Sequence, residues 1–184
     1  RYALKVYEAQ ILSLQQENDG LNEDELKKIT FEKGGVSMPL YRCGFEGEIN
    51  ELEYNLLYNL GAIGQLENDI FDVYKDDKSG VRTLVTTAKD INHLRQIYEN
   101  QIDNILKLID ATSFLPKNKL KFKHFTALVV CSGLVCLDML QELSKKNGSV
   151  FQPEIYERKY LICDMQRPSN VLKVLNYAAI YAKK

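Results

Sequence analysis

Apolar residues recur at intervals of three and four along most of the chain, the spacing of helices that bury one face. In residues 48–75, for example, Ile49, Leu52 and Leu56 follow this spacing. No long stretch alternates apolar and polar residues as a strand would. The pattern therefore predicts an all-α protein built from long helices. The expected helices span residues 2–17, 22–33, 48–75, 88–110, 124–145, 154–165 and 168–182.

Polar and glycine-containing segments mark the ends of several expected helices. Asn22, with Glu25 three residues later, is close to a capping box, in which the two residues satisfy free backbone N–H groups at a helix start. Gly34–Gly35 is expected to end that helix, and residues 37–43 are expected to be irregular. Residues 114–116 close the helix at 88–110, so the lysine-rich segment after them is expected to lead into the apolar helix at 124–145.

Two glycines, Gly61 and Gly64, lie inside the expected helix at 48–75. A glycine in a helix interior costs roughly 1 kcal/mol relative to alanine. We therefore expect a packing or functional reason for these two residues.

The charge balance argues against a general attraction to polyanions. The chain carries 24 Lys plus Arg and 25 Asp plus Glu among 184 residues, which gives a net charge of −1. Such a protein has no strong field to attract nucleic acid or an anionic membrane. Any anion that it binds must be held locally, for example through a metal ion.

The cysteines and histidines give little support for a zinc site. The four cysteines form no C-x-x-C pair, and the chain has only two histidines. Scattered cysteines of this kind are expected to be buried thiols rather than disulfides. No signal peptide is visible, so a cytoplasmic location is expected.

The longest apolar run, residues 125–140, is interrupted by Ser132, Gly133 and Asp138. It is shorter than the roughly 20 residues that a membrane span needs. We therefore expect a buried core helix and no transmembrane segment. Asp138 is either a site carboxylate or, as is more common, a residue at the helix edge that reaches water.

An acidic stripe is the most informative local pattern. Asn68, Asp72 and Asp76 are spaced i, i+4, i+8, so their oxygen-bearing side chains share one face of a helix. Hard oxygen ligands in a row suit Mg²⁺, which combines few protein ligands with waters and phosphate oxygens. A solvated face is the alternative, because acidic i, i+4 pairs are common on helix surfaces.

The surrounding segment, residues 59–76, resembles the second metal-binding helix of class I isoprenoid synthases. Trans-prenyl diphosphate synthases carry Phe-Gln-x-x-Asp-Asp-x-x-Asp there, and terpene cyclases carry Asn-Asp-x-x-Ser-x-x-Lys-Glu. The chain is a hybrid of the two patterns. Gln65 matches the synthase glutamine, and Asp72 stands where the cyclases usually have serine. The residues that follow the cyclase pattern are Asn68, Asp69, Lys75 and Asp76.

The resemblance extends to both sides of this helix and covers about residues 5–90. Residues 30–35 are similar to the Lys-Thr-Gly segment whose lysine contacts diphosphate, which here is Lys33. Residues 10–18 resemble the glutamine-bearing helix before it. Residues 80–84 resemble the loop that follows the motif, where Arg82 either grips a phosphate oxygen or is a surface arginine.

The family's first aspartate-rich motif has no counterpart before Lys33. Two explanations remain open: the chain is the later part of a longer domain, or half of the metal site has been lost. We expect the first, because the chain begins at Arg1 within a helical pattern. Residues 1–184 are then a single helical domain, the C-terminal part of a bundle around a central cavity. Further N-terminal helices, or a second copy in a homodimer, would cover one side.

The resemblance implies a magnesium-dependent enzyme that ionises prenyl diphosphates, either a transferase or a lyase of isoprenoid biosynthesis. It implies that Mg²⁺ is bound by Asn68, Asp69, Asp72 and Asp76. The residues expected to be catalytic are Asn68, Asp72 and Asp76. It implies that the substrate is bound by Lys33, Gln65, Lys75 and Arg82. The alternative is a non-catalytic helical relative or partner subunit. The residues do not distinguish elongation, coupling and cyclisation.

Overall fold

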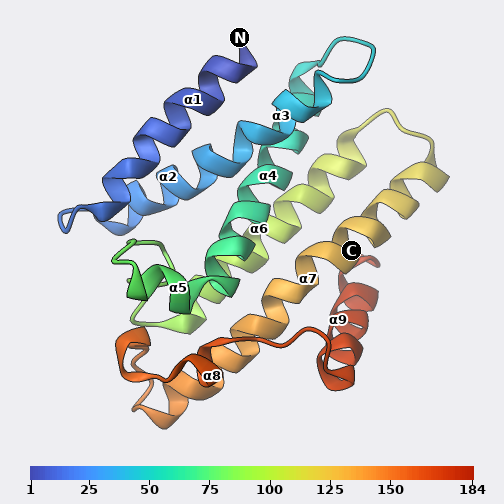
Figure 1. Ribbon diagram of the computed structural model, residues 1–184. Coiled ribbons are helices and arrows are strands. Elements are labelled where there is room, and N and C mark those ends of the chain that lie inside the picture. Colours follow the sequence, from blue (N-terminus) through green and yellow to red (C-terminus); the bar gives the residue numbers. More distant parts are fainter.

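The computed structural model describes all 184 residues, which form helices joined by loops, with no strand (Figure 1). The predicted all-α class is confirmed. Two short 3-10 helices span Leu14–Glu17 and Pro153–Ile155. The α-helices are α1 (Tyr2–Ser13), α2 (Glu23–Gly35), α3 (Ser37–Arg42), α4 (Glu51–Phe71), α5 (Val73–Lys78), α6 (Ile91–Ala111), α7 (Pro116–Lys146), α8 (Arg158–Leu161) and α9 (Pro168–Tyr181).

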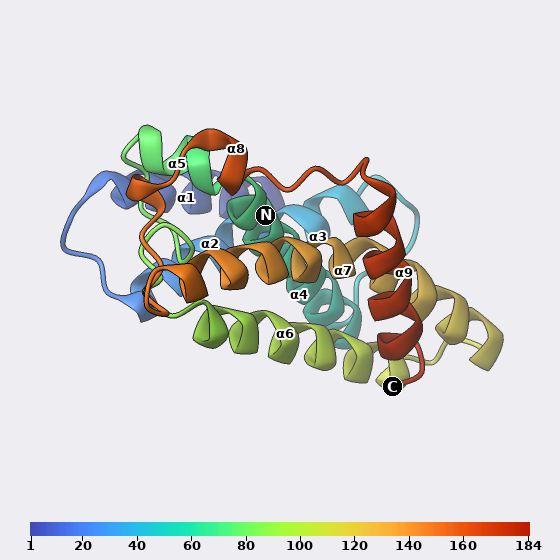
Figure 2. The same cartoon turned by 90° about the horizontal axis from the view of Figure 1, so that it is seen from below.

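Helices α4, α6 and α7 pack against one another at the centre of the molecule (Figure 1). Their buried faces supply most of a single hydrophobic cluster of 30 buried residues. Helices α1, α2 and α3 form a group on one side of α4, and α9 packs on α7. Seen from below, α6 and α7 run along the molecule side by side (Figure 2). Burial of these apolar faces is the main force that holds the helices together.

Helix α7 is the one helix long and apolar enough to cross a membrane by length and composition, and 61% of its most apolar stretch is buried inside the protein. A buried helix in the core of a globular domain can have the same length and composition. Helix α7 is therefore not a clear transmembrane segment.

The predicted capping box at the start of α2 is confirmed. Asn22 Oδ1 accepts from the Glu25 N–H at 3.0 Å, and Glu25 Oε2 accepts from the Asn22 N–H at 2.8 Å. The predicted end of this helix at Gly34–Gly35 is confirmed, since α2 ends at Gly35, but neither glycine has the positive φ of a left-handed cap. The segment expected to be irregular contains α3, which begins at Ser37, one residue after the end of α2.

Three other predicted boundaries differ from the structure. The helix expected at 48–75 is divided at Asp72 into α4 and α5, because the φ and ψ of Asp72 (−88° and 6°) depart from helical values. Helix α7 already begins at Pro116, since proline fits the first position of a helix, where its missing N–H is not needed. The helix expected at 154–165 is reduced to two short pieces around residues 153–161.

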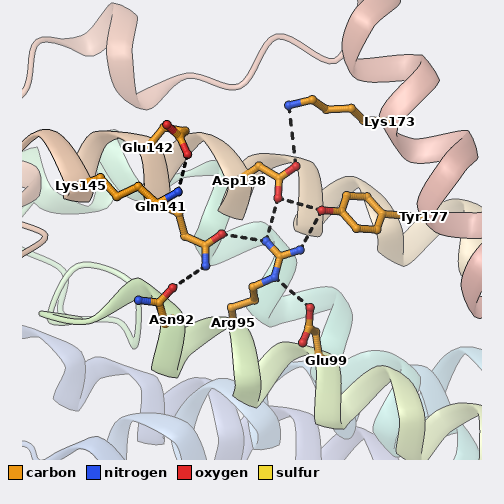
Figure 3. A network of polar contacts seen from close by, with 9 residues as sticks. All are labelled: Asn92, Arg95, Glu99, Asp138, Gln141, Glu142, Lys145, Lys173 and Tyr177. Atoms are coloured by element: carbon orange, nitrogen blue, oxygen red, sulfur yellow. Dashed lines mark hydrogen bonds and ion pairs between the residues drawn. The ribbon is translucent and has the colours of Figure 1, made fainter. Parts of the chain in front are cut away.

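Asp138 belongs to a polar network that joins α6, α7 and α9 (Figure 3). Arg95 of α6 donates to Asp138 Oδ1 at 2.8 Å and to the Tyr177 hydroxyl at 2.9 Å. The Tyr177 hydroxyl donates to the same Asp138 oxygen at 2.9 Å, and Lys173 lies 3.8 Å from the other oxygen. The carboxylate that interrupts the apolar run is therefore explained by cross-helix pairing.

Candidate metal and diphosphate site

The acidic stripe follows the C-terminal end of α4 and continues into α5. The backbone N–H of Asp72 donates to the Asn68 carbonyl at 2.8 Å, and the N–H of Asp76 donates to the Asp72 carbonyl at 2.9 Å. These i to i+4 hydrogen bonds are those of an α-helix. The i to i+4 backbone register of the three residues therefore continues across the break between the two helices.

The side chains of the stripe are near one another and reach solvent. Asn68 is exposed, and its amide donates to Asp72 Oδ2 at 3.5 Å. The same oxygen pairs with the ammonium group of Lys75 at 3.2 Å. Asp76 is half-buried, and its pKa is raised, first by burial and then by the negative charge of Asp72. Two carboxylates therefore lie close enough to repel each other, a situation that a bound cation relieves.

Asp69 faces in another direction, into the contact between α2 and α4. Its side chain accepts one hydrogen bond from the Thr30 hydroxyl at 3.0 Å and another from the Gln65 amide at 2.8 Å. Burial raises its pKa to about 6, although both hydrogen bonds act in the opposite direction. Both oxygens of Asp69 thus accept hydrogen bonds from protein groups. The amide of Gln65 is one of these donors.

Lys33, which belongs to α2, lies close to the stripe. Its positive charge lowers the pKa of both Asp69 and Asp76, against the larger effect of burial. Lys33 is half-buried, yet its ammonium group makes no hydrogen bond or ion pair. A partly buried ammonium group without a partner is costly. An anion bound beside the stripe would supply the partner that Lys33 lacks.

A backbone contact between two glycines brings Lys33 to this position. A Cβ atom at Gly34 would lie 2.1 Å from the Gly61 carbonyl oxygen, and one at Gly61 would lie 2.2 Å from the Gly34 carbonyl oxygen. Only glycine permits helices α2 and α4 to approach so closely. Gly61 thus has the packing role expected for an interior glycine. A Cβ at Gly64 would meet nothing within 4 Å, so packing does not explain that residue.

Arg82 makes no hydrogen bond or ion pair with the side chains of the stripe. Its guanidinium lies 3.5 Å from Asp19, and its backbone N–H and carbonyl pair with Gln16. Arg82 also lines a cavity to which the stripe contributes no residue. Asn68, Asp72 and Asp76 line none of the larger cavities of the molecule.

The donor set of the stripe is compatible with a magnesium ion held in part by the protein. No three His, Cys, Asp or Glu side chains are grouped so that they could hold a metal ion by themselves. Asn68, Asp72 and Asp76 offer amide and carboxylate oxygens, the ligands that Mg²⁺ prefers. Waters and phosphate oxygens would have to complete the shell.

Sequence reasoning missed Glu67, which is turned away from the stripe toward α7. Its carboxylate accepts hydrogen bonds from the Ser132 hydroxyl and from the backbone N–H of Gly133, the latter at 3.0 Å. Burial raises the pKa of Glu67. Glu67 thus fixes the end of α4, where the stripe begins, against α7. A Ser-Gly pair inside the apolar run was the available signal, but it did not identify the partner.

No protein family, curated protein or solved structure matches this chain. The function is therefore argued from the residues of the site and from the motifs that they form.

Proposed function

We propose that this protein is a magnesium-dependent enzyme of the class I isoprenoid synthase type, which acts on prenyl diphosphates by ionising the diphosphate. The observation that carries the proposal is the juxtaposition of the stripe with Lys33. Three hard oxygen groups stand in helical register, and an unpaired ammonium group lies near enough to lower the pKa of Asp76. A magnesium diphosphate needs this combination of oxygen ligands and positive charge.

Each residue of the site has a distinct role in this proposal. Asn68, Asp72 and Asp76 hold the metal ion, which on binding would neutralise charge on the leaving diphosphate. Lys33 binds the diphosphate directly from the side of α2. Asp69 and Gln65 act by position, since their hydrogen bonds tie α4 to α2 through Thr30.

Lys75 is placed differently from the other residues expected to bind substrate. It pairs with Asp72 in the present structure, and its side chain is 73% exposed. Surface ion pairs of this kind contribute little to stability, so Lys75 can exchange Asp72 for a phosphate oxygen at small cost.

The sequence motifs support the same proposal. The segment that resembles the diphosphate-binding Lys-Thr-Gly motif lies against the segment that resembles the metal-binding helix, through Gly34 and Gly61. These two segments are separated by residues 36–58, and nothing in helix propensity alone requires them to meet. A terpenoid synthase-like bundle is the finer fold assignment that we propose on this basis.

The proposal predicts magnesium-dependent release of inorganic diphosphate from geranyl or farnesyl diphosphate. Asp76→Asn should lower this rate by about 100-fold, the upper range for loss of a metal-site carboxylate interaction. Asp77→Asn is the matched control, because Asp77 lies in the same helix but off the stripe and pairs with Lys78. Its rate should stay within about twofold of the unmodified protein.

A non-catalytic helical partner subunit is the second candidate, and exposed apolar residues favour it. Helix α1 exposes Leu4 and Ile11, and α7 exposes Phe125, Leu128 and Val129, each by more than 40%. Such surfaces commonly mark protein interfaces. Absence of diphosphate release in both the unmodified protein and Asp77→Asn, with magnesium present, would favour this candidate.

A further inference from the structure

The molecule has a cleft of about 760 Å³ that the proposed function does not use. It lies between the start of α2, the loop at residues 82–90 and the start of α6. Its volume falls within the roughly 300–1,000 Å³ of small-molecule sites. None of Lys33, Asn68, Asp72 and Asp76 lines it, so the cleft shares no lining residue with the candidate metal site.

Six of the 13 residues that line this cleft are apolar. Leu26, Leu84 and Leu94 line it and belong to the buried core, and Ile97 is half-buried against that core. An apolar group that entered the cleft would cover the exposed parts of the half-buried Leu21, Ala88 and Ile97 and would remove its own surface from water. This apolar part of the lining therefore suits a hydrocarbon chain or ring.

The acidic groups at the rim are already engaged. Glu23 Oε1 lies 2.7 Å from His93 Nε2, a contact that joins the starts of α2 and α6. Asp90 caps α6 and accepts from the Asn92 N–H at 2.8 Å. These carboxylates thus have protein partners and are poorly placed to receive a cation.

The basic groups at the rim are not fully engaged. Arg82 Nε is buried and has no hydrogen-bond partner. The only ion pair of Arg82 is a 3.5 Å contact with Asp19, whose side chain is fully exposed and therefore held weakly. Lys89 makes no side-chain hydrogen bond or ion pair. Buried donors without partners are uncommon in folded proteins and are expected to have a function or a ligand.

We propose that this cleft binds an amphipathic anion, namely a carboxylate or phosphate ester attached to an apolar chain or ring. The guanidinium of Arg82 forms two parallel hydrogen bonds with the anionic group, since its fork matches either oxyanion. Lys89 adds a second positive charge, and the apolar part lies on Leu21, Ala88 and Ile97. This inference does not depend on the proposed function.

The two histidines of the chain provide a local test. His93 lines the cleft, whereas His124 lies on α7 and does not. Titration with sodium octanoate at constant pH should shift the imidazole NMR signals of His93 and leave those of His124 in place. Octyl phosphate tests the phosphate source, and 1-octanol tests the need for charge. Affinity should rise about fourfold for each methylene from hexanoate to octanoate.

Substitutions test the role of the guanidinium. Arg82→Gln should weaken octanoate binding about tenfold or more, the effect of losing a charged hydrogen bond, and Arg82→Lys should lie between. Lys121→Gln, which removes an exposed lysine of α7, should leave the affinity unchanged. The inference is overturned if octanoate leaves His93 unshifted, if octanol binds as tightly as octanoate, or if a folded Arg82→Gln or Arg82→Lys protein binds as the unmodified one does.

Discussion

Gly61→Ala is expected to lower the free energy of unfolding by about 3 kcal/mol, the upper part of the range for overpacked interiors. The new Cβ would lie 2.2 Å from the Gly34 carbonyl oxygen and 3.0 Å from the Met38 side chain. Backbone atoms cannot turn aside as a flexible side chain can, so α2 and α4 would have to separate. That separation would also move Lys33 away from the stripe.

Gly64→Ala is the matched control, three residues later in the same helix. Its Cβ would meet nothing within 4 Å, and alanine is the better helix former. The variant should gain up to about 1 kcal/mol. Urea denaturation of both variants measures the difference. Equal effects of the two substitutions would contradict the close α2–α4 contact.

Asp69→Asn is expected to stabilise the protein near neutral pH by on the order of 2–3 kcal/mol. Burial raises the pKa of Asp69 from 3.8 to about 6, so the folded protein resists ionisation of this carboxyl more than the unfolded chain does. The unmodified protein therefore has the full contribution of this group below about pH 4. It loses that contribution as the pH rises to about 6.

Asparagine at this position avoids the buried charge. It can still accept from Gln65, and its amide can donate to the Thr30 hydroxyl, so both contacts are kept. The stability difference between Asp69→Asn and the unmodified protein should be small at pH 4 and should grow to its full value by pH 7. Denaturation at several pH values measures it, and a difference that does not change with pH would count against the buried, hydrogen-bonded carboxylate.

Local rules recovered the parts of the fold that depend on neighbouring residues. The capping box at Asn22 and Glu25 needs only four residues of sequence, and it was predicted correctly. The end of α2 at Gly34–Gly35 was also predicted correctly, but the reason for the two glycines was not, because they serve a contact with α4 rather than a left-handed turn. Glycine is required in both situations, and only the position of the other helix distinguishes them.

For the candidate site as well, the local spacing could be predicted from the sequence, and the contacts between distant residues could not. The i, i+4, i+8 spacing identified the stripe, and the backbone hydrogen bonds keep that register. The sequence could not distinguish Asp69 from its neighbours, because its partner Thr30 lies 39 residues away. Arg82 lies in a loop without periodicity. Its position beside Asp19 and at the edge of the cleft is set by tertiary structure, so the sequence could not predict it.

Thermal unfolding with magnesium and inorganic diphosphate tests the central claim most directly. A ligand that binds only the folded state at 100 times its Kd adds about 2.7 kcal/mol to stability. Because the stripe offers too few oxygens to complete a magnesium shell, both components together should raise the Tm by more than the sum of their separate effects. Asp76→Asn should abolish this excess, and Asp69→Asn should retain it. Additive shifts, absent shifts, or an excess that survives Asp76→Asn would contradict a shared metal and diphosphate site at the stripe.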